Sequence, residues 1–577
     1  MKMSNLTSAV AGDIKSTNAI LEMLQRGFTF HKSGHFEKAK AIYANILIID
    51  PDNFDALQLS GAIASQEKKW SVALNFYTQA LAVNSNSATL FCNHGIALKA
   101  LHRINEALSS YERAIELKYD YAEAFYNQAI ALSEINRFEE SLASYDKAIE
   151  FKFDYAEAYY NRGIIAQKLK RLDDAIASYD KAIEYKRDYY EAYCNRGIVL
   201  HQLHQMPEAL ASLDKAIELK SDYAQAHYNR GKILNEQKQL QEALASYDKA
   251  IALKSNFAEA HHNKSLSLLI LGQFAEGFKE YEWRWKTQNF QSDQVRPPQP
   301  EWTPGSKHRV LLWAEQGVGD EIMFGTLLND FKGHCTELIV EADQRLLPLY
   351  QRAMPEGITF VARHTVVPEQ AYDSHISMAS LCQYLRNEEA QFVQARKAYL
   401  RPDPQRTQRI RDELALAPDR LICGISWHSQ NTEIGAAKSI QLTELIRHLD
   451  LPDCQWVNLQ YGDMSEQIAQ VKTDLGVDIV QCASVDNRQD LDGLASLIDV
   501  CDVVISISNT TVHLAGALGK KVHVMLPFCA DWRWQHLRSD SIWYPHVQLH
   551  RQPTPGDWNS VFAQVRATLI TQPESLS

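Results

Sequence analysis

Two stretches of this 577-residue sequence place glycines, hydroxyls and free backbone amides where a strand-like run gives way to a helix-like run. The first extends from Trp313 to Glu321, and its glycines, Gly317 and Gly319, let the backbone approach a ligand closely. The second extends from Ile507 to Gly519, and its helix-like part begins at four polar residues, Ser508, Asn509, Thr510 and Thr511. Hydroxyls and unpaired amides at a helix start are what binding a diphosphate requires. The two stretches therefore predict a phosphate-containing ligand.

The first stretch has an alternative interpretation as a dinucleotide-binding loop. In the pattern G-x-G-x-x-G the third glycine would fall at Ile322, so the pattern is broken. Glu341, at the end of the next strand-like run, is the remaining feature that such a loop requires. An NAD-linked oxidoreductase is therefore disfavoured.

Three further polar residues could take part in chemistry. Asp490 and Asp492 have the D-x-D spacing of metal-dependent transferases, but they open the helix-like run 491–500, where acidic residues are favoured. We assign them to helix capping and expect no metal. Ser426 follows the strand-like run 421–425, where its hydroxyl either reaches a phosphate or belongs to an ordinary polar loop.

The elements that must position these residues begin at residue 309. From there short apolar runs alternate with helix-like patterns, which predicts βαβ units and parallel sheets. The expected strands are 310–313, 338–340, 359–361, 421–425, 456–459, 502–507 and 522–526. The charged stretch 401–420 divides this α/β half into two doubly wound lobes, 309–400 and 421–577. Ligands in such folds bind outside the carboxyl ends of the strands, in the expected cleft between the lobes.

The N-terminal half is periodic. A column of small residues and a column of tyrosines recur every 34 residues, as do six asparagines: Asn93, Asn127, Asn161, Asn195, Asn229 and Asn263. This is the period of tetratricopeptide repeats, helix pairs that bury their apolar faces by stacking on neighbouring pairs. We expect an all-α superhelix of about eight units over residues 20–291, after a tail at 1–19 and before a proline-containing linker at 292–308. Aspartates such as Asp120 and Asp154 are expected to cap the next helix.

The asparagine ladder has two interpretations. A row of amides on a concave surface can pair with successive peptide groups whatever the side chains, which would hold an extended polypeptide partner. Asparagine at this position can equally form hydrogen bonds within or between repeats.

Composition limits the remaining classes. The net charge of −12 disfavours a general nucleic-acid binder, because such surfaces need an excess of basic residues. Nine cysteines without a C-x-x-C pair suggest reduced thiols rather than a zinc ribbon or a disulfide framework. No signal-like or membrane-spanning apolar run occurs, so we expect a cytoplasmic protein.

Several of these residues together resemble a known enzyme class. Gly319-Asp320, Lys438 and residues 508–519 look like the heptosyltransferase-type glycosyltransferases of the B fold, over roughly residue 309 to the end. In architecture the chain also resembles the O-linked N-acetylglucosamine transferases, whose repeats carry an asparagine ladder at the same position. Four further signatures, combined with the repeats, resemble a bacterial family of repeat-bearing glycosyltransferases: Tyr281-Glu282-Trp283-Arg284, Asp531-Trp532-Arg533-Trp534, Trp543-Tyr544-Pro545 and Arg551-Gln552.

The resemblance implies inverting, metal-independent sugar transfer from a nucleotide sugar bound mainly by the second lobe, with the acceptor at the first and no other cofactor. It makes Asp320 the base that takes the proton from the acceptor hydroxyl. It makes Lys438 the cation that neutralises the leaving diphosphate. Without the resemblance, Asp320 is a helix cap and Lys438 an ordinary exposed lysine.

The sequence also departs from the family pattern. Where many relatives have an aspartate-threonine pair five residues before the histidine, this chain has Ser508 and Asn509, so a carboxylate is lost. His513 keeps its place, where it either contacts the diphosphate or sugar or is packed in the first turn of the helix. The aromatic residues of the C-terminal signatures either stack on a base or sugar ring or pack in the core: Trp532, Trp534, Trp543 and Tyr544.

The sequence thus predicts a cytoplasmic glycosyltransferase whose repeats recruit a protein or glycan-assembly partner. The alternative is a non-catalytic repeat scaffold with a degenerate transferase half.

Overall fold

The computed structural model describes residues 3–288, 290, 297–354, 356–417, 419–430 and 435–571, with side chains described from residue 18 to residue 570. The chain divides into two compact units, Met1–Asn229 and Arg230–Ser577. We describe each unit by itself.

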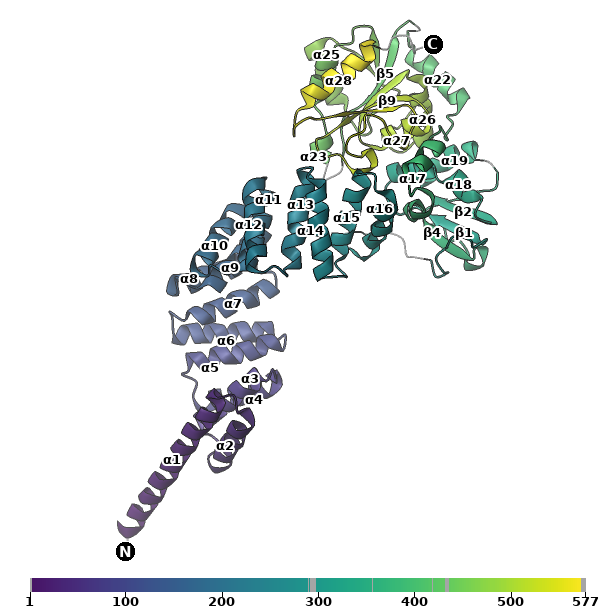
Figure 1. The fold of residues 1–577 in the computed structure, drawn as a ribbon. Coiled ribbons are helices and arrows are strands. Elements are labelled where there is room, and N and C mark those ends of the chain that lie inside the picture. The colour runs from purple at the N-terminus through teal and green to yellow at the C-terminus, as the bar shows by residue number, and fades with distance from the viewer. Residues whose placement is uncertain are drawn as a thin grey trace. The chain divides into compact units, whose positions relative to one another are not determined.

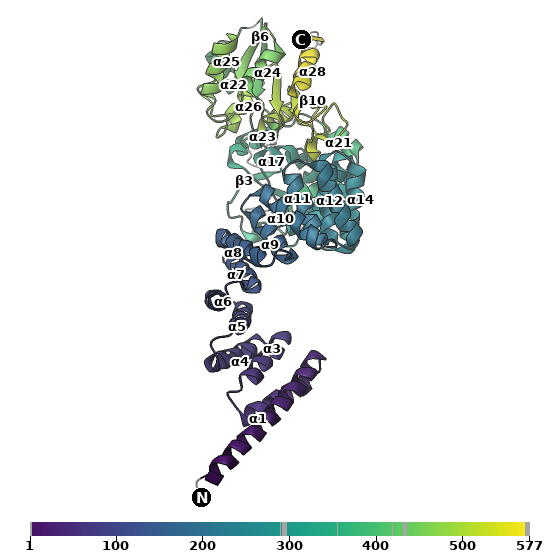
Figure 2. The same ribbon diagram turned by 90° about the vertical axis from the view of Figure 1, so that its left-hand side faces the viewer.

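The first unit consists of α-helices stacked pair upon pair (Figures 1 and 2). Its helices are α1 (Met3–Lys32), α2 (Phe36–Ile49), α3 (Phe54–Gln66), α4 (Trp70–Val83), α5 (Ala88–Ala100), α6 (Ile104–Leu117), α7 (Ala122–Glu134), α8 (Phe138–Phe151), α9 (Ala156–Lys168), α10 (Leu172–Tyr185), α11 (Tyr190–Gln202) and α12 (Met206–Leu219), and α13 (Ala224–Glu236) spans the boundary between the units. Residues 3–19, expected to form a tail, are part of α1, and no proline interrupts that stretch.

The 34-residue period reflects one packing unit. A Cβ atom on Gly163 would lie 2.6 Å from the ring of Tyr179, which is completely buried. Gly61 and Tyr77 repeat this contact. Only glycine or a comparably small residue leaves room for the tyrosine ring here, so the two columns of the sequence are two sides of one contact.

The expected aspartate caps are wrong. The N-cap of α7 is Tyr121 and that of α9 is Tyr155, and neither cap makes a side-chain hydrogen bond. Asp120 lies one residue too early, and its backbone carbonyl instead accepts a hydrogen bond from the Ala122 amide. Side-chain caps occur earlier, where Asn53 caps α3.

The second unit begins with the last repeats, α14 (Leu240–Leu253), α15 (Ala258–Ile270), α16 (Phe274–Tyr281) and the 3₁₀ helix η1 (Glu282–Lys286). The first lobe then has a four-stranded parallel sheet in the order β3-β2-β1-β4. Its strands are β1 (Arg309–Trp313), β2 (Glu337–Ala342), β3 (Thr359–Ala362) and β4 (Ser374–Ser377). Its α-helices are α17 (Val318–Gly325), α18 (Leu328–Lys332), α19 (Leu347–Ala353), α20 (Cys382–Leu385) and α21 (Glu389–Ala395).

The second lobe has a six-stranded parallel sheet in the order β10-β9-β8-β5-β6-β7. Its strands are β5 (Leu421–Ser426), β6 (Cys454–Asn458), β7 (Ile479–Val480), β8 (Val503–Ile507), β9 (Lys521–Leu526) and β10 (Val547–Arg551). Its helices are α23 (Gly435–Lys438), α24 (Leu442–Leu449), α25 (Ser465–Leu475), α26 (Leu491–Val500), α27 (Thr510–Ala517), η5 (Trp532–Trp534) and α28 (Trp558–Thr571). The fold is therefore an all-α repeat array followed by an α/β region with two parallel sheets, as predicted. Strands β4, β7 and β10 were not predicted from the sequence.

The two expected connecting segments are structured where they are described. Residues 292–296 of the expected linker lie outside the described residues, whereas Trp302 is 2% exposed and its amide donates to the carbonyl of His375 in β4. The segment 401–420 contains α22 (Pro404–Leu414), which packs against α26 of the second lobe.

One apolar core runs through the second unit. It includes Phe274 and Phe278 of the last repeat helix, Val310 of the first sheet and Trp532 of the second lobe. The last repeat is therefore part of the same folded body as the two lobes.

Candidate functional site

The two glycine- and hydroxyl-containing stretches meet in space. Helix α17 follows β1 and helix α27 follows β8, and the two helices pack against each other. A Cβ atom on Gly319 would lie 3.2 Å from Cδ2 of His513 and 3.6 Å from Oγ1 of Thr510. Gly319 thus allows α17 to approach α27, whereas a Cβ on Gly317 would meet no described atom within 4 Å.

Four charged side chains of alternating sign lie at this meeting point. Arg533 of η5 donates from Nε to Oδ1 of Asp320 at 2.6 Å, and its Nη1 lies 3.7 Å from Oδ1 of Asp531. Lys438 Nζ lies 3.4 Å from Oδ2 of Asp531. The four side chains are 12–23% exposed, so they are shielded yet reachable from solvent. The structure therefore joins the two sequence-predicted residues, Asp320 and Lys438, through two others.

The cluster shifts the pKa values of its carboxyl groups in opposite directions. Burial raises the pKa of Asp320 above its ordinary value, although Arg533 acts against this rise. Burial also acts to raise the pKa of Asp531, but Arg533 and Lys438 outweigh it and leave that pKa below its ordinary value. Asp320 is thus the better proton acceptor of the two.

The sequence analysis named Arg533 and Asp531 only as parts of a signature. A usable signal was present, because the motif at residues 531–534 follows strand β9 just as the other two stretches follow β1 and β8. The rule that ligands bind after strand ends applies equally to this third loop.

His513 occupies the packed environment that was its second interpretation. It is 5% exposed, its Nδ1 lies 3.0 Å from the hydroxyl of Tyr544, and its ring stacks on Trp534 at 5.4 Å. Burial, reinforced by Arg533, lowers the pKa of His513 to about 3. The imidazole is therefore neutral at neutral pH.

Most of the predicted phosphate-binding hydroxyls bond inside the protein. The Ser508 hydroxyl accepts from Nε1 of Trp534 at 2.8 Å, and the Ser426 hydroxyl accepts from Nδ2 of Asn509 at 2.7 Å. Oδ1 of Asn509 accepts from the Thr511 amide at 3.1 Å and so caps α27. These contacts shape the start of α27 and leave half-exposed Thr510 as its accessible hydroxyl.

The aromatic residues of the C-terminal signatures belong to the core. Trp532, Trp534, Trp543 and Tyr544 are each at most 5% exposed. They position the charged residues of the loop rather than present open rings.

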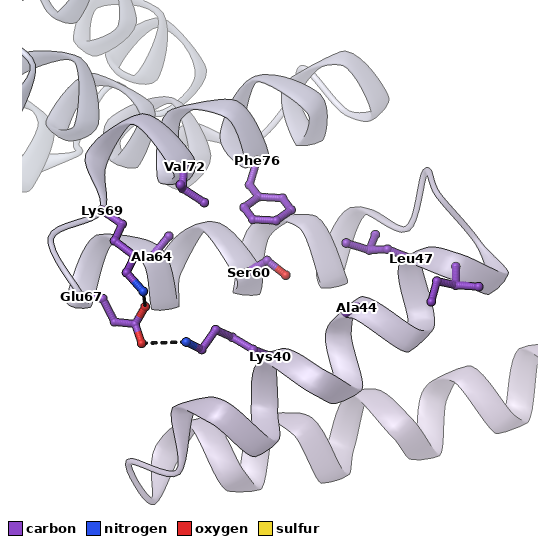
Figure 3. Close-up of a pocket in the computed structure, with 10 residues that line it drawn as sticks. Lys40, Ala44, Leu47, Ser60, Ala64, Glu67, Lys69, Val72 and Phe76 are labelled. Carbon is purple, nitrogen blue, oxygen red and sulfur yellow. Dashed lines mark hydrogen bonds and ion pairs between the residues drawn. The ribbon is translucent and has the colours of Figure 1, made fainter.

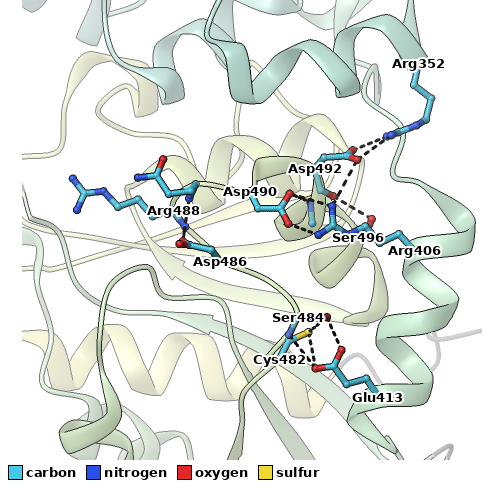
Figure 4. Close-up of polar contacts among 12 residues, drawn as sticks. Arg352, Arg406, Glu413, Cys482, Ser484, Asp486, Arg488, Asp490, Asp492 and Ser496 are labelled. Atoms are coloured by element: carbon cyan, nitrogen blue, oxygen red, sulfur yellow. Dashed lines mark hydrogen bonds and ion pairs between the residues drawn. The ribbon is translucent and has the colours of Figure 1, made fainter.

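The D-x-D pair is held by arginines, as Figure 4 shows. Asp490 caps α26 by accepting from the Gly493 amide at 2.9 Å, and it pairs with Arg406. Both oxygens of Asp492 accept from Arg352 at 2.8 and 3.1 Å. The assignment to capping is confirmed for Asp490, and Arg352 of the first lobe ties Asp492 to its place in the second.

The Tyr281–Arg284 signature attaches the last repeat to the first lobe. Arg284 is completely buried, and its Nη2 donates to Glu315 at 2.8 and 3.0 Å and to Ser377 and Ser380. Glu315 lies just after β1, so this buried network links the repeats to the strand that leads into the Asp320 loop. Glu341, the feature that favoured a dinucleotide, instead accepts from the His364 amide at 2.8 Å.

The asparagine ladder forms hydrogen bonds between neighbouring repeats. Nδ2 of Asn161 donates to the Tyr126 hydroxyl at 2.9 Å, and Nδ2 of Asn195 donates to the Tyr160 hydroxyl at 3.1 Å. Asn229 is 8% exposed. The donor side of these amides therefore serves the repeat stack.

A groove with a volume of about 530 Å³ lies in the first repeats (Figure 3). Leu47, Val72 and Phe76 form part of its apolar lining, and an ion pair between Lys40 and Glu67 at 2.9 Å closes one end. The groove thus presents apolar side chains at the surface of the first unit.

Searches of the described residues for two other features gave none. No group of three or more histidine, cysteine, aspartate or glutamate residues arranged to hold a metal ion occurs in this part of the chain. None of its helices is both long and apolar enough to cross a membrane.

Comparison with known proteins identifies the repeats. Models described as tetratricopeptide repeat match residues 88–121, 156–189 and 224–257, and a model described as TPR repeat matches residues 131–170 and 201–237. The N-terminal half therefore contains tetratricopeptide repeats, which supports a protein-interaction scaffold. The α/β region is compatible with a transferase.

A curated protein with sequence similarity to the chain is Protein FlbA of Caulobacter vibrioides (strain ATCC 19089 / CIP 103742 / CB 15). The two are 31% identical over 324 residues, which cover 52% of this chain and 53% of FlbA. The chain thus spans about half the length of this relative.

Similar solved structures include YrrB, described as a TPR protein with an unusual peptide-binding site, and MamA. YrrB is 25% identical, with 33% of this chain and 98% of YrrB covered and a TM-score of 0.30. For MamA the identity is 24%, the covered shares are 28% and 96%, and the TM-score is 0.27. TM-scores below 0.5 do not by themselves establish a common fold.

Proposed function

We propose that this protein transfers a sugar from a nucleotide sugar to a hydroxyl group of a protein or glycan acceptor. The observation that carries the proposal is the alternating cluster Asp320–Arg533–Asp531–Lys438, which lies where α17 and α27 meet. It combines a shielded carboxylate, two cations and a helix N-terminus after the strand ends, where ligands of α/β folds bind.

The proposed reaction inverts the anomeric carbon and needs no metal. Asp320 takes the proton from the acceptor hydroxyl while that oxygen forms a bond to the anomeric carbon of the donor sugar. The bond between this carbon and the diphosphate oxygen breaks, and its electron pair leaves with the nucleoside diphosphate. Lys438 and the amides at the start of α27 stabilise the negative charge that develops there.

The environment of Asp320 suits a base. A raised pKa brings a carboxylate closer to the working pH and so strengthens it as a proton acceptor. Both contacts from Arg533 reach Oδ1, and among the described residues no hydrogen bond involves Oδ2 of Asp320. That second oxygen is the one we assign to the acceptor proton.

The repeats supply the partner-binding surface in this proposal. Because Asn161 donates its N–H to Tyr126, its Oδ1 remains an acceptor for a peptide N–H of a bound polypeptide. Asn195, which donates to Tyr160 in the same way, extends this row. All nine cysteines are free thiols, which fits the reducing cytoplasm where we place the protein.

The test is the variant Asp320→Asn in a transfer assay with candidate nucleotide sugars. We expect turnover to fall by about 10²-fold or more, with folding and nucleotide binding retained. A thermal-shift screen against nucleotide sugars and UDP, ADP and GDP identifies the donor, because a ligand that binds only the folded state raises its stability. Unchanged turnover would remove Asp320 from the role of base.

A non-catalytic scaffold is the second candidate function. It is favoured by the internal bonding of Ser508 and Ser426, which leaves fewer free groups for a diphosphate. The scaffold would capture partners through the repeats and show neither nucleotide binding nor transfer in the same screen.

A further inference from the structure

Arg533 contacts the proposed base, Asp320, and is held in that position by a neighbouring side chain. Its Nε donates to Asp320 at 2.6 Å and its Nη2 lies 3.4 Å from Oε1 of Gln316. Gln316 is itself fixed, because its Nε2 donates to the hydroxyl of Tyr281 in the last repeat helix at 2.8 Å. The guanidinium is therefore directed at Asp320 by contacts on several sides.

The contact between Arg533 and Asp320 weakens Asp320 as a base. A guanidinium that binds the carboxylate favours its charged form, so it opposes the rise in pKa that burial causes. Asp320 therefore becomes a stronger base when Arg533 moves to another anion.

A diphosphate is a stronger competitor for Arg533 than Asp320 is. It carries more negative charge, and the planar fork of a guanidinium matches the geometry of phosphate oxygens. Lys438 lies on the other side of Asp531, 3.4 Å from its Oδ2, so two cations flank this carboxylate and can act together on a diphosphate. Arg533 can keep its link to Asp531 through Nη1 while its other N–H groups change partner.

We propose that Arg533 is a positioning residue that couples donor binding to release of the base. The donor diphosphate takes the guanidinium from Asp320, and Asp320 is then free to accept the proton of the acceptor hydroxyl. This inference rests on the proposed function, and it predicts that Asp320 is unmasked only when the donor is bound.

The test measures protons taken up on binding. When Arg533 leaves Asp320 for a phosphate, the pKa of Asp320 rises, so binding below neutral pH takes up protons. The charged and titratable groups that face Asp320 are Arg533, Asp531, Lys438, Tyr281, His513 and Tyr544. Burial raises the pKa of Tyr281 to about 12 and lowers that of His513 to about 3, so neither titrates in this range. Parallel measurements on Asp320→Asn and Asp531→Asn separate the two carboxylates.

The experiment is calorimetry of UDP, GDP, ADP and inorganic pyrophosphate at pH 6 in two buffers of different ionisation enthalpy. We expect proton uptake in the wild type that is absent in Asp320→Asn and kept in Asp531→Asn. Arg533→Met should weaken binding by at least about tenfold and abolish the uptake, and Arg533→Lys should restore part of both. The acid limb of the pH profile of kcat/KM should shift to higher pH in Arg533→Met.

A matched control separates this role from a structural one. Arg396→Met breaks a more exposed arginine–aspartate pair outside the site, in which Arg396 contacts Asp540 at 2.8 Å, and it should change neither affinity nor proton uptake. Melting curves verify that each variant is folded. Wild-type affinity and proton uptake in folded Arg533→Met would overturn the inference.

Two further outcomes bear on the proposed function. Absence of binding of all four probes to the wild type would overturn both proposals. Binding with the expected proton uptake, but without sugar transfer to any acceptor, would contradict the proposed function alone.

Discussion

The repeat array and the charged site are both stabilised by hydrogen bonds between polar side chains, but the bonds connect residues at very different separations. Asn161 and Asn195 each bond a tyrosine 35 residues earlier, in the preceding repeat. Arg533 bonds Asp320 across 213 residues, and Lys438 reaches Asp531 across 93. The array is therefore built from contacts between neighbours, whereas the site exists only when distant loops have been brought together.

This difference has an energetic consequence. In a repeat array each unit contacts only its neighbours, so a change in one contact is felt by one or two repeats. In the second unit, one of the apolar cores includes the last repeat helix and residues of both lobes. A change in its buried network should therefore affect all of these parts together.

Among the substitutions, Arg284→Ala should produce the largest effect. The substitution leaves Glu315, whose side chain is 1% exposed, as a buried and uncompensated charge. The free energy of unfolding of the second unit should fall by about 3–5 kcal/mol, measured by chemical denaturation followed through tryptophan fluorescence. As a control, Arg309→Ala removes an exposed pair with Asp373 and should cost at most about 1 kcal/mol. Equal losses in the two variants would refute a buried link between the last repeat and the first lobe.

Acid should destabilise the second unit more than the first. Burial lowers the pKa values of His513 and His523 to about 3 and that of His550 to about 4, whereas in the unfolded chain they lie near 6.5. Between the folded-state and unfolded-state pKa values of these histidines, the unfolded state binds more protons than the folded state. Their contribution to the free energy of unfolding is therefore fully present above about pH 6.5 and is lost as the pH falls. Each histidine should contribute about 1.4 kcal/mol per pH unit over that range.

Denaturation at pH 7 and at pH 5 measures this dependence. His513→Gln should reduce the pH slope by the contribution of one histidine, and an unchanged slope would mean that His513 is not buried neutral. In the first unit burial lowers the pKa of His94, and we expect the response of this unit to acid to be weaker than that of the second.

Lys438→Ala should weaken binding of a nucleoside diphosphate by about 1–3 kcal/mol, because a charge-assisted hydrogen bond to phosphate is lost. Calorimetry with the diphosphate found in the ligand screen measures the change. Lys472→Ala, which removes an exposed lysine paired with Asp478, is the control and should bind normally. Normal binding to Lys438→Ala would place the phosphate site elsewhere.

The smallest effect should come from the asparagine ladder. Asn161→Ala and Tyr126→Phe each remove one partner of a hydrogen bond between repeats, and each should cost about 0.5–1.5 kcal/mol of stability in the first unit. The double variant should cost less than the sum, because both single changes remove the same bond.

Additive losses of stability in Asn161→Ala and Tyr126→Phe would show that the two side chains do not interact.

Partner capture by the same variants then tests whether the asparagine ladder also binds a polypeptide, and variants of Phe76 test the groove of Figure 3 in parallel. Unaltered capture in the ladder variants would leave the groove as the better partner site.

The sequence predicted the repeats better than the details of the site. The 34-residue period predicted stacked helix pairs, and the structure shows that the small and tyrosine columns meet in one contact, as between Gly163 and Tyr179. Seven of the ten strands in the described residues were predicted, but the short β7 and the polar β4 lacked a clear apolar pattern. The expected aspartate caps failed because a shift of one residue, which the period does not resolve, moves Asp120 out of the cap position.

The chain by itself determined its period, its two-part organisation and the location of loops after strand ends, since these follow from local patterns of apolar and small residues. Only the tertiary structure decided that Arg533 pairs with Asp320, that His513 is buried beneath Tyr544, and that Ser508 bonds to Trp534. Each of these contacts joins loops from different strands of the sheets. The physical reason is that a charge or hydrogen-bond partner is selected by proximity in the folded protein, and proximity between residues so far apart in the chain leaves no periodic trace in the sequence.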